Sequence, residues 1–478
     1  MGVKFGPRQL MLDVITPDSP DGGEHLSGSR FLVLGMGVGG TSALRALNEV
    51  GASAVSVDAN GGADLTSMEG LRLDEFDAVM VSAAFSPHSA PVLACQAVGL
   101  PLWSEMEFAW RVRANDAPWV MVTGTNGKTT TTQMVGAIAT AAGIDVKVCG
   151  NMGEPVIDAA RAGHGLLAVE IASLQLHFTS TISPAATVCL NVDSDHLDWH
   201  GSLEAYRADK ARVFRHVRTA AVYPACDRLV ETMVEEADVV EGCRAVGVTL
   251  GAPSTSQLGV VDGILLDRAF GEARHREAIE IGHVNDLQHL VTGDVPPYLV
   301  TNALSAAALV RAVGGSAESV GVGLRAFALD HHRTAFVRRL DDVAYVDDSK
   351  ATNAHAAIAA FGGKRQRSVV WIAGGLAKGQ SFDSLVKEVR DRLRAVVLIG
   401  VEAEPLAGAL AEHAADVPVK RIGPGETVMS DAVAAAREFA HPGDTVLLSP
   451  ACASMDQFRN YADRGEAFAE RVRALEGS

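Results

Sequence analysis

A pattern of apolar strand, turn and helix begins three times in this chain, and this recurrence limits the folds available to it. The first strand, Phe31–Leu34, precedes several glycines and a helical pattern from about Thr41 to Val50. Trp119–Val122 begins the second pattern, and a third begins near Arg338. Strands that alternate with helices build parallel sheets. The sequence therefore predicts an α/β protein with mostly parallel sheets.

The length of 478 residues favours about three domains, because one hydrophobic core rarely serves so long a chain. Residues 1–29, rich in Gly, Pro, Asp and Ser, are expected to form a flexible extension. The expected domains are residues 30–105, 106–329 and 330–478. Further strands are predicted at 54–57, 78–81, 166–171, 187–192, 343–346, 368–373, 395–400 and 445–449, with a hairpin around Asp262-Gly263 and a helix at about 301–313.

The net charge of −17 excludes long-range attraction to nucleic acid or to anionic membranes. Any phosphate-bearing ligand must therefore be bound by local groups such as helix N-termini, a few lysines or a metal ion. None of the six cysteines forms a C-x-x-C pair, so buried free thiols in a reducing compartment are expected. We recognise no signal peptide at the N-terminus, and residues 171–192 are too polar for a membrane span. A cytoplasmic location is expected.

The segment Val122–Thr130 reads V-T-G-T-N-G-K-T-T, after a predicted strand and at the start of a predicted helix. The backbone N–H groups of such a loop can wrap phosphates, and Lys128 can reach the β- and γ-phosphates. The hydroxyl of Thr129 or Thr130 can bind Mg²⁺. Val122 replaces the first glycine of the usual P-loop, so the match is to a shorter variant, and a tight turn with an exposed lysine is the alternative. The predicted ATP-binding loop comprises Gly124, Thr125, Asn126, Gly127, Lys128, Thr129 and Thr130.

A second glycine-rich turn, Gly35–Gly40, matches G-x-G-x-x-G between a strand and a helix, and Asp58 follows the next strand. Alone, this pattern is typical of a dinucleotide-binding dehydrogenase. Glycines needed only for close helix–strand packing are the alternative. A simple dehydrogenase does not need a separate phosphate loop with a lysine, so the loop at 124–130 argues against that enzyme class.

Several polar side chains follow the strands of the middle segment. Glu170 ends an apolar strand, where a carboxylate can bind the Mg²⁺ of a nucleotide, although a solvated strand-end carboxylate is the alternative. Asp193, Asp195, His196 and Asp198 crowd one turn, which is costly unless a cation neutralises the carboxylates. His196 is a candidate metal ligand or a structural histidine. By pattern alone, the lysine at 210 is an ordinary surface residue.

Together these segments resemble the Mur ligase superfamily, and within it the ligases that add D-glutamate. The resemblance covers nearly the whole chain from about Arg30. It is carried by G-T-N-G-K-T-T at 124–130, G-N-M-G-E-P at 150–155, E-I-A-S-L-Q-L at 170–176, D-S-D-H-L-D at 193–198, Y-R-A-D-K at 206–210, H-H-R at 331–333, D-D-S-K-A-T-N at 347–353, G-G-L-A-K at 374–378 and S-P-A-C-A-S-M-D-Q-F at 449–458. The last segment and D-S-K-A-T-N favour the glutamate-adding members over their siblings.

The resemblance implies an ATP-dependent carbon–nitrogen ligase that joins D-glutamate to UDP-N-acetylmuramoyl-L-alanine through an acyl phosphate. ADP and phosphate would be released, and the reaction would serve peptidoglycan synthesis, cell-wall biogenesis, cell shape and cell division. The implied architecture is a Rossmann-like N-terminal domain for the UDP-sugar, a central P-loop ATPase-like domain with a mostly parallel sheet, and a Rossmann-like C-terminal domain for the amino acid. ATP and two Mg²⁺ ions are the implied cofactors, and a monomer is expected.

The resemblance also assigns roles to individual residues. The implied catalytic residues are Lys128, Glu170, His196 and Lys210, and the implied metal ligands are Thr129, Glu170, His196 and, if carbamylated, Lys210. Asn302, Arg333 and Asp348 would join the phosphate loop in binding ATP. Gly37, Val38, Asp58, Asn151 and His196 would bind the UDP-sugar. Thr352, Lys378, Ser449 and Phe458 would bind D-glutamate.

The sequence departs from the family pattern at three places. Ala83-Ala84-Phe85 replaces a Ser-Pro-Gly turn that helps to bind the uracil nucleotide, and Ala59-Asn60 replaces a polar and basic pair that binds phosphate. Tyr298-Leu299 replaces a His-Asn pair near adenine. We therefore predict that ATP chemistry is kept and that UDP recognition is rearranged or relaxed. The alternatives are another Mur-type or folylpolyglutamate-like ligase, a nucleotide-binding pseudoenzyme or regulatory protein, and the dehydrogenase.

Overall fold

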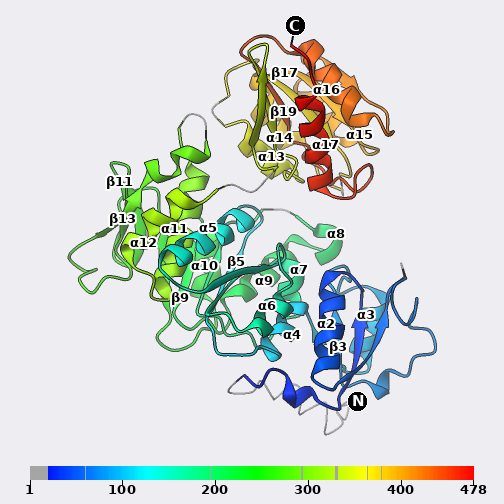
Figure 1. Ribbon diagram of the computed structural model, residues 1–478, viewed down its shortest axis with the longest axis vertical. Coiled ribbons are helices and arrows are strands. Elements are labelled where there is room, and N and C mark those ends of the chain that lie inside the picture. Colours follow the sequence, from blue (N-terminus) through cyan, green and yellow to red (C-terminus); the bar gives the residue numbers. More distant parts are fainter. Residues whose placement is uncertain are drawn as a thin grey trace. The chain divides into compact units, whose positions relative to one another are not determined.

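The computed structural model describes residues 20–59, 61–193, 195–291, 294–328, 332–362, 364–377 and 379–477. The chain divides into two compact units, Met1–Phe327 and Ala328–Ser478. The first unit contains two sheets and the second unit contains one, each with helices packed beside it (Figure 1). The predicted α/β class is therefore confirmed for both units.

Four parallel strands form the first sheet, in the order β2-β1-β3-β4. Helix α2 begins at Val38, earlier than the predicted Thr41, so Gly40 lies in its first turn. A Cβ on Gly40 would lie only 2.0 Å from the carbonyl oxygen of Gly35, and glycine therefore allows the helix to pack closely against the end of β1. The elements are η1 (Glu24–Leu26), β1 (Arg30–Leu34), α2 (Val38–Glu49), β2 (Ser53–Val57), η2 (Leu73–Glu75), β3 (Ala78–Val81), α3 (Ala90–Ala97), β4 (Leu102–Trp103) and α4 (Glu105–Arg111).

The described part of the expected N-terminal extension is packed. Leu26 is fully buried in the core of the first unit, and the N–H of Gly22 donates to the carbonyl oxygen of Arg113. The expectation of flexibility is therefore wrong for residues 20–29, because one apolar side chain finds a core position among the polar residues. For residues 1–19 the expectation lies outside the described residues.

Nine strands form the second sheet, in the order β13-β12-β11-β10-β9-β8-β5-β7-β6. The strands from β6 to β11 in this order pair in parallel, and β12 and β13 add antiparallel strands. The strands are β5 (Trp119–Thr123), β6 (Val146–Gly150), β7 (Leu166–Glu170), β8 (Ala186–Cys189), β9 (Ala220–Pro224), β10 (Arg244–Val248), β11 (Gln257–Val261), β12 (Ile264–Asp267) and β13 (Ile279–His283). The helices and 3-10 turns are α5 (Lys128–Ala141), α6 (Val156–Ala162), α7 (Ser173–His177), α8 (Leu197–His200), α9 (Leu203–Ala211), η3 (Arg212–Phe214), α10 (Arg228–Glu235), η4 (Val284–Leu290), α11 (Pro297–Ala312) and α12 (Ala317–Ala326).

Two predictions for this sheet have different outcomes. The hairpin around Asp262-Gly263 is confirmed, and both residues have positive φ (51° and 78°), as a two-residue hairpin turn requires. The strand predicted over 187–192 ends at Cys189 instead. Residues after Cys189 leave the sheet because Asn191 turns toward the loop at 124–127, as described below.

The second unit contains a six-stranded sheet in the order β14-β15-β19-β16-β17-β18, parallel except for the β14–β15 pair. Separate buried clusters cover its two faces, so the central strands are apolar on both sides. The strands are β14 (Ala335–Leu340), β15 (Val343–Asp347), β16 (Val369–Gly374), β17 (Leu393–Ile399), β18 (Val419–Arg421) and β19 (Thr445–Leu448). The helices and 3-10 turn are α13 (Ala354–Ala360), α14 (Asp383–Val389), η5 (Arg390–Arg392), α15 (Glu404–His413), α16 (Val428–Phe439) and α17 (Tyr461–Arg473).

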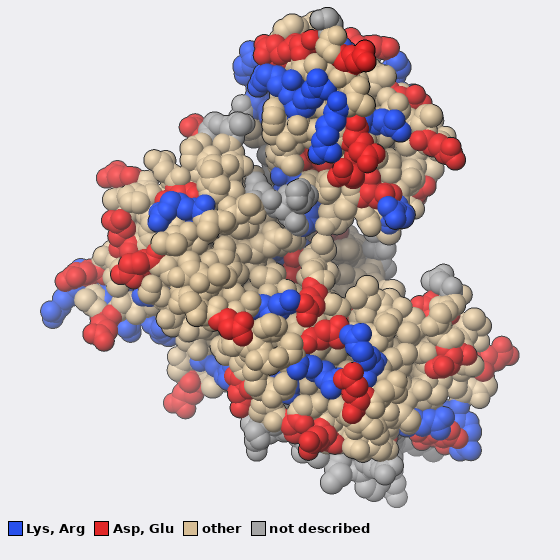
Figure 2. Space-filling view, in the orientation of Figure 1, with Lys and Arg blue, Asp and Glu red and all other residues tan. Residues whose placement is uncertain are grey.

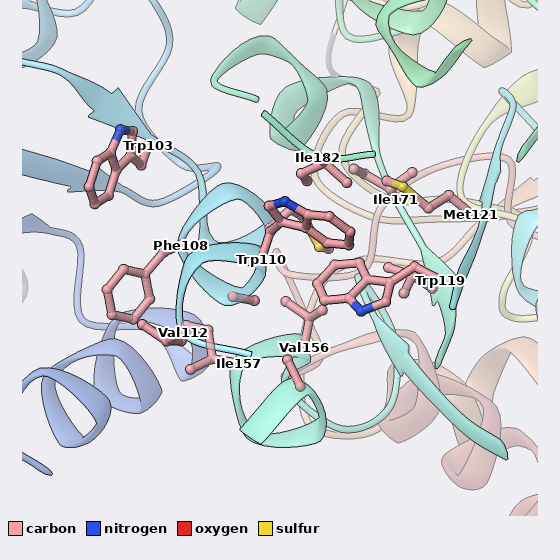
Figure 3. Packing of buried hydrophobic residues seen from close by; sticks show 14 of the residues in the cluster. Trp103, Phe108, Trp110, Val112, Trp119, Met121, Val156, Ile157, Ile171 and Ile182 are labelled. Carbon is pink, nitrogen blue, oxygen red and sulfur yellow. The ribbon is translucent and has the colours of Figure 1, made fainter. Parts of the chain in front are cut away.

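Helix α4 joins the cores of the two sheets in the first unit. Phe108 packs against Phe31 of β1, with ring centroids 6.2 Å apart. Trp110 meets Trp119 of β5 edge to face at 5.2 Å, and Figure 3 shows these two rings pointing toward one another. Each such aromatic side chain contributes about 1.5–3 kcal/mol on burial. One continuous core therefore holds the first two sheets in one unit.

Within the described residues, no helix combines the length and the apolar character needed to cross a bilayer. On the face of the first unit seen in Figure 2, acidic and basic side chains alternate in small groups. The six cysteines are free thiols. Cys95, Cys149, Cys189 and Cys452 are buried as predicted, whereas Cys243 is only partly buried and Cys226 is exposed.

Candidate active site

The loop Gly124–Gly127 connects β5 to α5 and has the backbone shape that a phosphate loop needs. Gly124 and Gly127 have φ angles of 154° and 84°, which L side chains rarely adopt. The ammonium of Lys128 folds back over the loop and donates to the carbonyl oxygens of Gly124 (2.9 Å) and Thr125 (3.0 Å). The side-chain amide nitrogen of Asn126 is buried and has no hydrogen-bond acceptor among the described residues. The loop therefore offers an unpaired donor and a nearby positive charge.

Residues after β8 hold this loop in place through hydrogen bonds. Asn191 accepts the N–H of Asn126 at 2.8 Å and donates its amide to the carbonyl oxygen of the same residue at 3.1 Å. The hydroxyl of Thr125 accepts the N–H of Asp193 at 2.9 Å and lies 2.8 Å from the hydroxyl of Tyr206. These contacts explain why β8 ends early, since its last predicted residues pair with the loop instead of the sheet.

Asn302 of α11 lies directly against the loop. A Cβ on Gly127 would lie 2.9 Å from the Asn302 carboxamide oxygen and 3.3 Å from its nitrogen, so only glycine fits there. The structure thus brings together the loop and one of the residues to which the family resemblance assigned adenosine binding. Thr129 and Thr130, in the first turn of α5, are both buried.

Glu170 ends β7 and is only 2% exposed. One carboxylate oxygen accepts the amide N–H of Asn151 at 2.9 Å. The other oxygen is buried and has no hydrogen-bond donor among the described residues. A buried carboxylate oxygen without a partner is costly, and a hard cation such as Mg²⁺ satisfies it. This feature fits a metal ligand better than a solvated carboxylate at the end of a strand.

Lys210 lies in α9 with its side chain buried, at 2% exposure, so its sequence pattern as a surface lysine was misleading. Its ammonium lies 4.8 Å from the centre of the Tyr206 ring. Burial, and secondarily the charge of Lys128, lower the pKa of Lys210 to about 7, although Cys189 and Asp195 oppose the shift. A substantial fraction of this side chain is therefore a neutral, nucleophilic amine near pH 7.

His196 differs from these buried groups. It has a left-handed backbone (φ 51°, ψ 33°) at the start of α8, and its side chain is 41% exposed. Its ring nitrogen lies 3.7 Å from a carboxylate oxygen of Asp195. The acidic turn predicted from the sequence thus surrounds an exposed histidine, and the side chain at position 198 lies outside the described residues.

The sequence reasoning missed a buried polar network beside Lys210. His200 has one ring nitrogen 2.8 Å from Asp209 and the other 3.0 Å from the hydroxyl of Ser173. His177 also contacts Asp209 at 2.8 Å, and Arg212 lies 3.1 Å from it. Burial alone would raise the pKa of Asp209, but its bonds to His177 and His200 hold it below the usual range. Only the position of Asp209 directly before Lys210 could have indicated this network.

The glycine-rich turn of the first sheet is organised around Asp58. A carboxylate oxygen of Asp58 accepts the N–H of Met36 at 2.8 Å, so Asp58 shapes the turn itself. Val38, at the start of α2, is 73% exposed, and Gly37 before it has an ordinary φ of −63°. Asn151, which is expected to bind the UDP-sugar, is exposed and donates to Glu170, the expected metal ligand.

In the second unit, Asp348 directly follows β15. It accepts the N–H of Thr334 at 3.1 Å and the hydroxyl of Ser449 at 2.7 Å. Burial raises the pKa of Asp348 to about 7, although the bond from Ser449 and the charge of Arg333 oppose the shift. Ser449 is fully buried and engaged with Asp348. Thr352 and Phe458 are partly exposed, and Lys378 lies outside the described residues.

A buried arginine joins two loops of the second unit and was also missed. Arg464 is 1% exposed and donates to the hydroxyl of Ser349 at 2.9 Å and to its carbonyl oxygen at 2.8 Å. It also donates to the carbonyl oxygen of Cys452 at 3.1 Å. The loops that contain Thr352 and Ser449 are therefore tied together.

Two family descriptions match this chain. Residues 122–310 match the Mur ligase middle domain, and residues 332–452 match the domain described as Mur ligase, glutamate ligase domain. Among curated proteins, the UDP-N-acetylmuramoylalanine–D-glutamate ligase of Streptomyces avermitilis is 47% identical over 470 residues, covering 94% of this chain and 98% of its own length. The protein of the same name from Streptomyces coelicolor is 45% identical and covers 94% of this chain and 99% of its own length.

Solved structures are similar in fold at much lower identity. The UDP-N-acetylmuramate-alanine ligase MurC of Thermotoga maritima aligns at a TM-score of 0.53 and 16% identity, covering 94% of this chain and 100% of that chain. MurF ligase of the same organism, in complex with ADP, aligns at 0.55 and 16% identity, covering 94% and 96%. These likenesses support the α/β architecture.

Proposed function

This chain belongs to the Mur ligase family, and we propose that it joins D-glutamate to UDP-N-acetylmuramoyl-L-alanine with the conversion of ATP to ADP and phosphate. The observation that carries the proposal is the 47% identity to a D-glutamate ligase over 94% of the chain. The phosphate loop and the buried groups beside it supply the matching chemistry. The reaction would contribute to peptidoglycan synthesis and hence to cell shape and division. A cytoplasmic monomer is proposed.

We assign residues 30–105 to UDP-sugar binding, 106–329 to ATP binding and 330–478 to amino-acid binding. Residues 1–29 precede these domains. In the first domain, Gly37, Val38 and Asp58 would bind the UDP-sugar, together with Asn151 and His196 of the second. In the third, Thr352, Lys378, Ser449 and Phe458 would bind D-glutamate.

ATP would bind with its phosphates on the loop at 124–130 and its adenosine beside Asn302. The unpaired amide nitrogen of Asn126 supports this assignment, because it has a donor free for a phosphate oxygen. We also assign Arg333 and Asp348 to ATP binding. Lys128 would exchange its bonds to loop carbonyls for the phosphates.

The donor set also fits Mg²⁺. The unpaired oxygen of Glu170 and the hydroxyl of Thr129 are hard ligands, and His196 is a candidate for the second of two ions. Lys210 would contribute an oxygen ligand once its neutral amine has added carbon dioxide to form a carbamate. When bound, the two Mg²⁺ ions would offset the negative charge of the transferring phosphoryl group.

In the proposed reaction, the carboxylate of the UDP-sugar substrate attacks the γ-phosphorus of ATP, and the bond to the ADP oxygen breaks. The amine of D-glutamate then attacks the acyl phosphate, and phosphate leaves from the tetrahedral intermediate as the amide forms. Lys128 stabilises the charge on the transferring group. Positioning supplies much of the remaining acceleration, so few side chains need to move protons.

The test is phosphate release from ATP and Mg²⁺ with UDP-N-acetylmuramoyl-L-alanine, with and without D-glutamate. L-glutamate and L-lysine serve as controls for the amino acid. Release that needs both the UDP-sugar and D-glutamate would support the proposal. Release with L-lysine in place of D-glutamate, or no release with any pair despite ATP binding, would contradict it.

A further inference from the structure

The loop Ser82–Phe85, which follows β3, is attached to the second sheet by one tryptophan. The indole N–H of Trp199, in α8, donates to the carbonyl oxygen of Ala83 at 3.0 Å. Trp199 is only 7% exposed and packs in a core cluster with residues of β1, β2 and β3. A side chain of the ATP-binding segment thus fixes a loop of the first sheet.

The same loop lies directly against the glycine-rich turn. A Cβ on Gly35 would lie 2.7 Å from Cβ of Ser82 and 3.2 Å from the ring of Phe85. The N–H of Phe85 donates to the carbonyl oxygen of Ser82 at 3.0 Å. Positions 83–85 contain no proline to restrict the backbone, so a contact from outside adds support to this turn. Trp199 supplies such a contact.

The next residue, His200, anchors α8 on its other side. Its two ring nitrogens lie 2.8 Å from Asp209 and 3.0 Å from Ser173. Asp209 directly precedes Lys210 in α9, and Ser173 begins α7, just after Glu170 and β7. The rings of Trp199 and His200 are themselves in contact, with centroids 4.6 Å apart.

We propose that Trp199 and His200 are positioning residues that tie the loop Ser82–Phe85 to Lys210 and Glu170, so that one helical turn sets where the uridine diphosphate group lies relative to the ligase centre. This inference deepens the proposed function and depends on it. In this proposal the hydrogen bond from Trp199 stabilises the loop Ser82–Phe85, which lacks the Ser-Pro-Gly turn of the family pattern. Helix α8 then determines the affinity for the UDP-sugar without direct contact with the sugar.

The test compares W199F with W110F. Both replace a buried indole with a smaller aromatic ring, since Trp110 is 6% exposed and packs on Trp119. Loss of one backbone-directed hydrogen bond is expected to raise the KM for the UDP-sugar about three- to ten-fold in W199F. The kcat and the KM for ATP should stay within about two-fold, and W110F should match the wild type within the same factor.

H200Q gives an independent measure. It should raise the same KM and also lower kcat, because it loosens the segments that carry Lys210 and Glu170. In the double variant W199F/H200Q the rise in KM should be smaller than the product of the two single effects, since both changes release one turn. The inference would be overturned if the KM of the double variant rose by the full product of the two single effects, or if the KM of W199F equalled that of W110F.

Calorimetric binding of UDP, without ATP or D-glutamate, separates this inference from the proposed function. Turnover failure of the wild type with its substrates would count against the function alone. Weaker UDP binding by W199F than by W110F supports the positioning role. Equal binding by these variants, or no binding of UDP to the wild type, refutes it. If W199F fails to fold, H200Q is compared with the wild type in the same assay.

Discussion

Replacement of Glu170 by glutamine should raise stability in metal-free buffer while it removes activity. The carboxylate is 2% exposed, and one of its oxygens has no donor among the described residues. Glutamine keeps the shape and the acceptor for Asn151 but removes the negative charge. In the absence of Mg²⁺, the native state of E170Q therefore lacks the uncompensated buried charge that destabilises the wild type.

The expected gain is about 1–2 kcal/mol in the free energy of unfolding of the first unit, the difference between leaving a charged and a neutral group unpaired. Mg²⁺ with ADP should stabilise the wild type by about 2.7 kcal/mol at one hundred times the dissociation constant. E170Q should lose most of that gain. Its kcat should fall at least about 100-fold, because the ion that offsets phosphoryl charge is bound less tightly.

The assay is urea unfolding of both proteins, with and without MgCl₂ and ADP, together with steady-state kinetics. Glu107 provides a matched control, since it is fully buried but accepts the guanidinium of Arg111 and the N–H groups of Ser180 and Thr181. E107Q should therefore destabilise the protein by about 3 kcal/mol. A metal-free E170Q that is less stable than the wild type, or one that gains as much from Mg²⁺, would refute the reasoning.

Three further outcomes are expected. K128A should lower kcat at least about 100-fold by removing a charge from the phosphate loop, and phosphate release measures it; near-normal turnover would refute the loop assignment. With a pKa of about 7, Lys210 should be about 10% neutral at pH 6 and about 90% neutral at pH 8. The NMR signal of the carbamate that ¹³C-labelled carbon dioxide forms at Lys210 should therefore rise across this range and be absent in K210A. A midpoint near pH 10 would contradict the effect of burial on this pKa. Burial raises the pKa of Asp348 to about 7, so the stabilisation from its protonated form is complete below about pH 3.8 and is lost as the pH rises through 7. In D348N the free energy of unfolding of the second unit should therefore change less between pH 4 and pH 8 than in the wild type. An unchanged pH profile would contradict this expectation.

Local sequence patterns were sufficient for the architecture and for the phosphate loop. The apolar runs at 78–81 and 445–448 are strands because buried parallel strands need continuous apolar side chains, and this requirement is visible residue by residue. Likewise Gly124 and Gly127 indicate a backbone conformation that only glycine adopts easily, and Lys128 after them is the residue that predicts phosphate binding by this loop.

Burial and long-range contacts were decided only by the tertiary structure. Lys210 has the local sequence of a surface lysine, yet it is buried beside Tyr206, because packing of α9 rather than its own pattern sets its exposure. The contact of Asn302 with Gly127, and that of Trp199 with Ala83, join residues far apart in the chain. Such contacts depend on how the sheets pack, so no local periodicity records them. The shared core around α4, which holds the first two sheets in one unit, is a contact of the same kind.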